Sequence, residues 1–167
     1  MNAMLRGLVR SDGQLLIVGA GTGAEILEFG KMNPDWRFLG VDPAQPMLDL
    51  AKEKIEAAGL TERASFFKGH VDELPIGRLY DGATLGMVLH FVADDGGKLK
   101  LLRAIASHLK AGAPLVLMDA YGDLTTPESQ LLLEAWKHQQ NLAGLKWEQV
   151  ENGMKERMLG IHFVSSN

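Results

Sequence analysis

Three closely spaced glycines follow an apolar run near the start of the chain. Leu15 to Val18 has the length and composition of a buried strand, and it leads into Gly19, Ala20, Gly21 and Gly23 before a segment of helical periodicity. Glycine has no Cβ to keep a ligand away, and a strand that turns into a helix leaves backbone N–H groups free. A tight turn without a ligand is the alternative, which so dense a cluster disfavours. We therefore expect these four residues to bind a small polar ligand through their N–H groups.

An aspartate ends the next apolar run. Asp42 follows the predicted strand Arg37 to Val41, and its two oxygens can accept both hydroxyls of an adenosyl ribose. Pro43 comes next, so Asp42 also suits a cap for the following helix, and the two roles are compatible. Both NAD and S-adenosylmethionine contain that ribose, and the glycines with Ala24 also fit the dinucleotide fingerprint. These residues alone therefore leave both cofactors open.

Strand-like and helix-like segments alternate over residues 15–119. This alternation is typical of βαβ units around a parallel sheet with right-handed crossovers. We expect an α/β fold: a Rossmann-like doubly wound sheet, mainly parallel, in three αβα layers. The predicted strands cover 15–19, 37–41, 65–68, 82–87 and 115–119. The predicted helices cover 24–31, 44–58, a segment capped by Asp94 that extends to 109, 126–144 and 147–158.

Composition excludes several classes of protein. The chain has 167 residues, 46% of them hydrophobic, which suits one domain. It contains no cysteine, so disulfides and thiolate metal sites are excluded and a reducing cytoplasm is the expected compartment. The apolar runs are shorter than a membrane span. A formal net charge of −4 disfavours a nucleic-acid partner held through its phosphates.

Five motifs in order separate the two cofactors. They read GAGTG, GVDPAQPML, FFKGHVDELP, YDGATLGMVLHFV and LKAGAPLVLMD, and together they span Leu15 to Asp119. Their order and spacing closely resemble those of class I S-adenosylmethionine-dependent methyltransferases. The resemblance implies S-adenosylmethionine as cofactor, a small-molecule methyl acceptor, and Pro43 and Met47 beside the cofactor. It also implies a single methyltransferase domain over 1–167, with the end of an N-terminal helix (1–14), a cofactor-binding core (15–119) and a truncated helical substrate-side segment (120–167).

Two regions, after the third strand and at the end of the fourth, carry the rest of the expected cofactor site. The family places an aspartate against the adenine after the third strand, whereas this chain has His70, which leaves that contact to the imidazole, to the Val71 N–H or to Asp72. An exposed loop residue is the alternative for His70. Gly86 and Met87 match the family positions beside the methionyl part of the cofactor. Packing in the core is the alternative for Met87.

A histidine follows the fourth strand. Methyl transfer needs a general base only when the acceptor is protonated at neutral pH, and a histidine suits that role. His90 is therefore the candidate catalytic residue, with Asp119 and Tyr121 as further candidates for the base. A packed and satisfied histidine between Leu89 and Phe91 is the alternative.

The residues after 119 bear on the subgroup and on assembly. Their helices resemble those of the tRNA wobble-uridine carboxymethyltransferase, but the arginine which that group uses falls at Glu156, with Arg157 beside it. This favours ordinary S-adenosylmethionine. The family's final strand pair is missing, so we expect the fifth strand to be an apolar edge that a homodimer contact or domain swap covers. A tRNA methyl- or carboxymethyltransferase, an NAD-binding oxidoreductase and a non-catalytic S-adenosylmethionine-binding module remain as alternative functions.

Overall fold

Five parallel strands form one sheet in the order β3-β2-β1-β4-β5. The computed structural model describes residues 1–119, 126–158 and 161, with side chains up to residue 153 and at 161. Because β1 pairs with both β2 and β4, the strand order reverses at β1, and ligands of such sheets bind outside the carboxyl ends of the strands at that point. The strands are β1 (Gln14–Val18), β2 (Arg37–Asp42), β3 (Ala64–Lys68), β4 (Gly82–Gly86) and β5 (Leu115–Met118).

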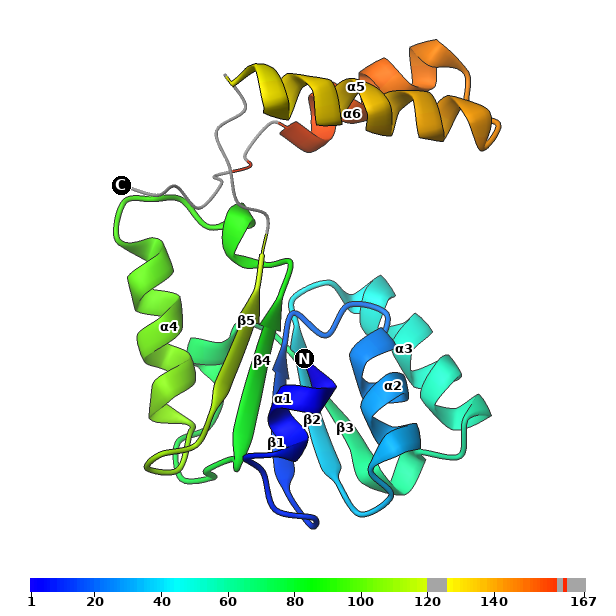
Figure 1. Cartoon of the computed structure of the whole chain (residues 1–167). Helices are drawn as coiled ribbons and strands as arrows, with labels where there is room; N and C mark the ends of the chain where they lie inside the picture. Colours follow the sequence, from blue (N-terminus) through cyan, green and yellow to red (C-terminus); the bar gives the residue numbers. More distant parts are fainter. Residues whose placement is uncertain (120–125, 159–160, 162–167) are drawn as a thin grey trace.

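Helices cover both faces of the sheet, which gives three layers (Figure 1). On one face lie α1 (Asn2–Arg6), α2 (Ala24–Met32) and α3 (Gln45–Ala57), and on the other lies α4 (Gly97–Ser107). Short 3-10 turns form η1 (Thr61–Arg63), η2 (Val71–Glu73) and η3 (Leu89–Phe91). The predicted Rossmann-like α/β fold class is confirmed.

The central strand β1 is buried on both sides. Leu15 and Ile17 pack toward α1, α2 and α3, whereas Leu16 and Val18 pack toward α4. A strand with two covered faces reads as a continuous apolar run, which is why this segment shows no alternation with polar residues.

The predicted strands agree with the observed ones to within one residue at each end. The predicted cap at Asp94 is wrong. The helix α4 begins only at Gly97, after Gly96 in a left-handed conformation with φ 98°. Asp94 instead forms an ion pair with Lys98 at 3.4 Å, and the Asp95 carboxylate accepts from the Gly97 N–H at 3.0 Å.

Two further helices lie beyond the carboxyl ends of the strands (Figure 1). They are α5 (Pro127–Leu142) and α6 (Trp147–Met158), which pack against each other. The Thr126 hydroxyl accepts from the Ser129 N–H at 3.2 Å, so the predicted helix start at Thr126 is confirmed. The candidate base Tyr121 and the side chains of Glu156 and Arg157 lie outside the described residues.

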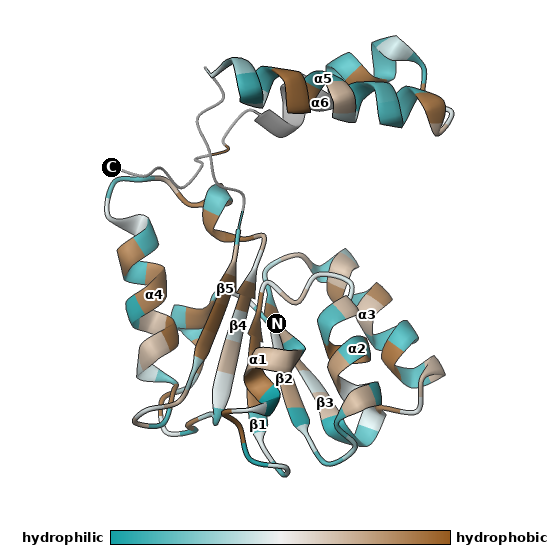
Figure 2. Cartoon of the chain, viewed as in Figure 1, coloured by the Kyte–Doolittle hydropathy of each residue, from teal (hydrophilic) through white to brown (hydrophobic). Residues whose placement is uncertain are grey.

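The last strand of the sheet presents apolar side chains to solvent. In β5, which is brown in Figure 2, Leu117 is 42% and Met118 50% exposed. No strand follows β5 within residues 126–158. The homodimer contact over this edge stays a prediction. Within the part of the chain that the structure describes, no helix is both long and apolar enough to cross a membrane.

An acidic side chain connects α2 to the strand β4. The Glu25 carboxylate, at the start of α2, accepts a hydrogen bond from the buried Thr84 hydroxyl of β4 at 2.8 Å. Burial raises the pKa of Glu25, and the Thr84 hydrogen bond opposes this only in part. An acid whose pKa rises on folding binds its proton more tightly in the folded state, so its contribution to stability falls as the pH rises.

Replacing Leu16 by alanine should lower the free energy of unfolding by about 2–5 kcal/mol, because it leaves a cavity where a fully buried side chain of β1 was packed. The matched change Leu131→Ala, at a side chain 72% exposed on α5, should alter it by less than about 0.5 kcal/mol. Urea unfolding followed by circular dichroism measures both values. Equal effects of the two substitutions would contradict the burial of β1.

Glu25→Gln removes the charge and keeps a group that can bond to Thr84. Near pH 7 this variant should have a higher free energy of unfolding than the wild type, because the charged carboxylate no longer has to be buried. The difference should shrink as the pH falls toward and below the ordinary glutamate value of 4.5, where the acid is protonated in both states. Urea titrations across this range test the sign, with the exposed Glu28→Gln as control. A less stable Glu25→Gln variant at pH 7 would overturn this account.

Candidate functional site

A cavity of about 1010 Å³ opens at the carboxyl ends of β1, β2 and β4. It lies at the point where the strand order reverses, as expected for a ligand site in an open parallel sheet. Its wall includes most of the predicted cofactor residues: Gly19, Gly21, Asp42, Pro43, Met47, His70, Val71, Gly86 and Met87.

The glycine loop after β1 depends on left-handed backbone conformations. Gly19, Gly21 and Gly23 have φ angles of 73°, 49° and 77°, which side chains rarely adopt. A Cβ at Gly19 would lie 2.1 Å from the side chain of Val88, so only glycine fits there. A Cβ at Gly21 would meet no side chain, which leaves the space above that residue to a ligand.

The prediction that the N–H groups of this loop are free to bind a ligand is wrong. The N–H groups of Gly19 and Ala20 both donate to the Val41 carbonyl, at 2.8 and 3.0 Å, and Gly23 donates to Ala20. Gly21 donates to the Asp42 carboxylate at 2.9 Å. These hydrogen bonds attach the loop to β2. The loop therefore lets a ligand come close to its backbone but offers it no set of free N–H donors.

Ala20 and Gly23 do not line the cavity. The Ala20 side chain is buried against Gly40 on the α2 and α3 face, and Gly23 approaches Ala51 of α3 at the start of α2. Both residues are small, so the loop packs closely against β2 and α3. Their role is to hold the loop in place and not to contact a ligand in the cavity.

Asp42 faces the cavity with both oxygens partly engaged. Oδ2 accepts from the Gly21 N–H and Oδ1 from the Ala44 N–H, each at 2.9 Å. A carboxylate has about four lone-pair sites, so roughly two remain for further donors. Its bond to Ala44 orders the turn before α3, whose N-cap residue is Ala44 itself with no side-chain cap. The carboxylate can therefore hold the turn and bind two hydroxyls.

The wall after β3 carries a charged pair. His70 is exposed at the cavity, and its backbone N–H donates to the Glu73 carboxylate at 2.6 Å. Asp72 forms an ion pair with Lys100 of α4 at 3.0 Å, and both residues line the cavity. The hydrogen bond from Lys100 lowers the pKa of Asp72, so this carboxylate is charged near neutrality. The pair links η2 to α4 across the cavity.

The chain turns sharply at the end of β4. Met87 has a φ of 57°, an uncommon conformation for a residue with a side chain, and it is 49% exposed at the cavity. The alternative for Met87, packing in the core, is thereby excluded. A Cβ at Gly86 would lie 2.8 Å from the Glu25 carboxylate, so the strand passes close to that acid.

The candidate base His90 pairs with Asp119. Its ring Nδ1 contacts Asp119 Oδ1, and Asp119 Oδ2 accepts from the Val88 and Leu89 N–H groups at 3.0 and 2.6 Å. His90 is 5% exposed and does not line the cavity, although its neighbours Val88 and Phe91 do. Asp119 is committed to these partners, so it is poorly placed to act as a base itself.

The wall of the cavity on the α4 side was not predicted from the sequence. Val92, Gly97, Leu101 and Ala104 line the cavity there. Gly97, Leu101 and Ala104 recur at helical spacing, and this stripe of small and apolar residues is the signal that could have located the wall. Within the described residues, no group of three or more His, Asp or Glu side chains is placed to hold a metal ion.

Comparison with known proteins agrees with this geometry. A demethylmenaquinone methyltransferase from Lactiplantibacillus plantarum is 27% identical over 129 residues, which cover 76% of this chain and 52% of that protein. The chain spans about half the length of the curated relatives it matches.

Solved structures share the fold. An O-methyltransferase family 2 protein from Planctomyces limnophilus, in complex with apigenin, is 26% identical with a TM-score of 0.60, over 70% of this chain and 35% of that one. A methyltransferase from Thiobacillus denitrificans, in complex with S-adenosylhomocysteine, has a TM-score of 0.62 at 20% identity, over 79% and 51%. The family model described as a methyltransferase domain matches residues 15–112, more than half of the chain. The chain therefore belongs to the methyltransferase domain family, and the resemblance to class I S-adenosylmethionine-dependent methyltransferases is confirmed.

Proposed function

We propose that the chain binds S-adenosylmethionine in the large cavity and forms the cofactor-binding part of an enzyme that methylates a small molecule. The observation that carries this proposal is Asp42, a nearly buried carboxylate that faces the cavity and retains lone pairs for two hydroxyls. Family membership supports it, and so does the S-adenosylhomocysteine complex of the Thiobacillus denitrificans structure.

The residues present fit the parts of this cofactor. Asp42 would accept the ribose hydroxyls, and the open space above Gly21 admits the methionyl chain close to the backbone. Met47, His70 and Val71 would contact the adenine, with the Val71 N–H as donor to a ring nitrogen. That N–H is not bonded to any residue that the structure describes. Gly86 and Met87 would border the sulfonium end.

The chain's contribution to methyl transfer is placement. When bound, the cofactor supplies an activated methyl group. The apolar side chains of Met87, Phe91 and Val92 line the same cavity and would exclude water from the acceptor. Alignment of the reacting groups in such a cleft contributes several orders of magnitude to the rate.

His90 is the proposed proton acceptor for a hydroxylated substrate. Its contact with Asp119 fixes the ring orientation and favours a proton on Nδ1, which leaves Nε2 to accept one. Because the ring is nearly buried, the acceptor hydroxyl must approach it from the cavity, whose wall here contains Val88 and Phe91. The domain division proposed from the sequence assigns the acceptor's other contacts to residues 120–167.

The alternatives are less well supported. Two of the relatives described above are named with a small molecule: one with demethylmenaquinone and one with apigenin. Neither name describes a tRNA-modifying enzyme. The tRNA wobble-uridine subgroup therefore has no support from these comparisons. An NAD-binding oxidoreductase and a non-catalytic binding module are tested directly by the ligand preference and by turnover.

Asp42→Asn should weaken S-adenosylhomocysteine binding about tenfold to hundredfold, because charge-assisted hydrogen bonds contribute roughly 1.5–3 kcal/mol. Isothermal titration calorimetry measures this on the full chain. Asp49→Asn is the matched control, since Asp49 lies exposed on α3 and, among the described residues, bonds only to Gln45 and Lys52. Unchanged affinity in Asp42→Asn, or NAD binding tighter than that of S-adenosylhomocysteine, would refute the cofactor assignment.

His90→Gln should lower kcat for a phenolic acceptor by about 10²–10⁴ while the affinity for S-adenosylhomocysteine stays unchanged. The loss should be smaller at alkaline pH, where the phenol ionises without a base. Production of S-adenosylhomocysteine from S-adenosylmethionine with a panel of phenols measures the rate. An unchanged rate in His90→Gln would exclude this residue as the base, and cofactor binding without turnover of any acceptor would favour the non-catalytic module.

A further inference from the structure

A second cavity, of about 240 Å³, lies on the α4 face of the sheet beside β2 and β3. The connection from β3 to β4 contains only η2 and an irregular segment, 74–81, so no long helix covers these strands there. On the opposite face α2 and α3 do cover them. The cavity shares no lining residue with the large one and is therefore a separate site.

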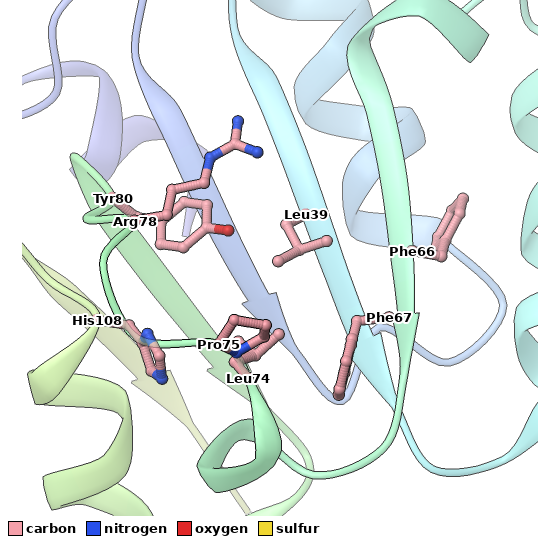
Figure 3. A pocket seen from close by; sticks show the side chains of 8 residues that line it. All are labelled: Leu39, Phe66, Phe67, Leu74, Pro75, Arg78, Tyr80 and His108. Carbon is pink, nitrogen blue, oxygen red and sulfur yellow. The ribbon is translucent and has the colours of Figure 1, made fainter.

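The walls of this cavity are apolar. Leu39 of β2, Phe67 of β3 and Leu74 after η2 converge on it, with Pro75 beside Leu74 (Figure 3). Phe66, the neighbour of Phe67, points away from the other side chains in the same view. A small cavity lined by these apolar side chains suits one aromatic ring.

Two buried polar side chains open into the same space. Tyr80 is 3% and His108 4% exposed, and neither side chain makes a hydrogen bond within the described part of the chain. No fully buried side-chain nitrogen or oxygen of the described residues lacks a partner, so these polar atoms retain some accessible surface, and both residues line the cavity. Figure 3 shows the Tyr80 hydroxyl pointing toward Leu39. Burial raises the pKa of Tyr80, so its hydroxyl stays protonated and can donate.

The positively charged side chain of Arg78 lies at the edge of the cavity. The Arg78 guanidinium stacks over the Tyr80 ring at 5.6 Å and donates through Nε and Nη2 to Gln14 Oε1, at 3.2 and 2.8 Å. Among the described residues, no carboxylate forms an ion pair with Arg78. Two hydrogen bonds and a ring contact fix the group, while its remaining N–H donors and its charge have no acidic partner.

We propose that this second cavity binds a small aromatic carboxylate, with its ring between Leu39, Phe67 and Leu74 and its carboxylate on Arg78. The Tyr80 hydroxyl and the His108 imidazole provide further polar contacts at the buried end. The volume is slightly below the ~300–1,000 Å³ typical of pockets for drug-sized ligands, which matches a molecule with a single ring. The carboxylate follows from the fixed cation, because guanidinium and carboxylate pair in a bidentate fashion.

Benzoate is the probe that tests this site on the full chain. Isothermal titration should show saturable binding that persists in the presence of saturating S-adenosylhomocysteine. Nuclear Overhauser effects between the benzoate ring protons and the methyl groups of Leu39 and Leu74 should locate the ring. Arg78→Gln should weaken binding at least about tenfold, and benzamide should bind the wild type correspondingly weakly, because each has lost one charge of the pair.

Arg37→Gln is the matched control, since Arg37 lies exposed at the start of β2 and donates to the Glu62 carbonyl outside the cavity. The affinity of the Arg37→Gln variant for benzoate should equal that of the wild type. The proposal is overturned if benzoate does not bind saturably, if S-adenosylhomocysteine displaces it, or if Arg78→Gln binds it as tightly as the wild type. Overhauser effects to residues outside the cavity would likewise overturn it, and this measurement needs no variant.

Discussion

The candidate site depends on the carboxylate of Asp42. Its two oxygens bind the N–H of Gly21 in the loop after β1 and the N–H of Ala44 before α3. Hydrogen bonds to a charged and nearly buried acceptor are among the stronger ones in proteins. They hold the loops that follow two neighbouring strands, and the cavity opens between those loops. One side chain thus shapes the edge of the cavity and presents its remaining lone pairs to it.

Asp119 performs the same structural task on the other half of the sheet. It follows β5 and accepts from Val88 and Leu89 after β4, so it fixes the turn into η3. The two aspartates differ in surroundings: Asp42 lines the cavity, whereas the Asp119 side chain is 2% exposed and also contacts His90. The first is therefore suited to ligand binding and the second to holding the wall and orienting the histidine.

The sequence predicted the elements and the cavity residues that rest on local signals. Apolar runs located all five strands, and the glycines and Asp42 located the cavity, because these features follow from backbone requirements within a few residues. The predictions that failed depend on contacts between segments that are distant in the sequence or on the exact start of a helix. The N–H groups of Gly19 and Ala20 are bonded to Val41 of another strand, and the later start of α4 moved its N-cap by two residues, from Asp94 to Gly96. The cavity wall on α4 was missed because Leu101 and Ala104 carry no chemistry by themselves.

The strand order has a consequence for how the site arises during folding. Because β1 lies between β2 and β4, its second pairing joins Leu15 to Gly82, segments far apart in sequence. Closing so large a loop costs chain entropy before the contacts repay it, which makes such pairings slow. The half of the cavity formed by Gly21 and Asp42 needs only the β1 and β2 segments, whereas the half at Gly86 and Met87 needs the later pairing of β4. A chain emerging in order from its N-terminus therefore holds the half of the site proposed to bind the ribose before it can complete the half where methyl transfer would occur.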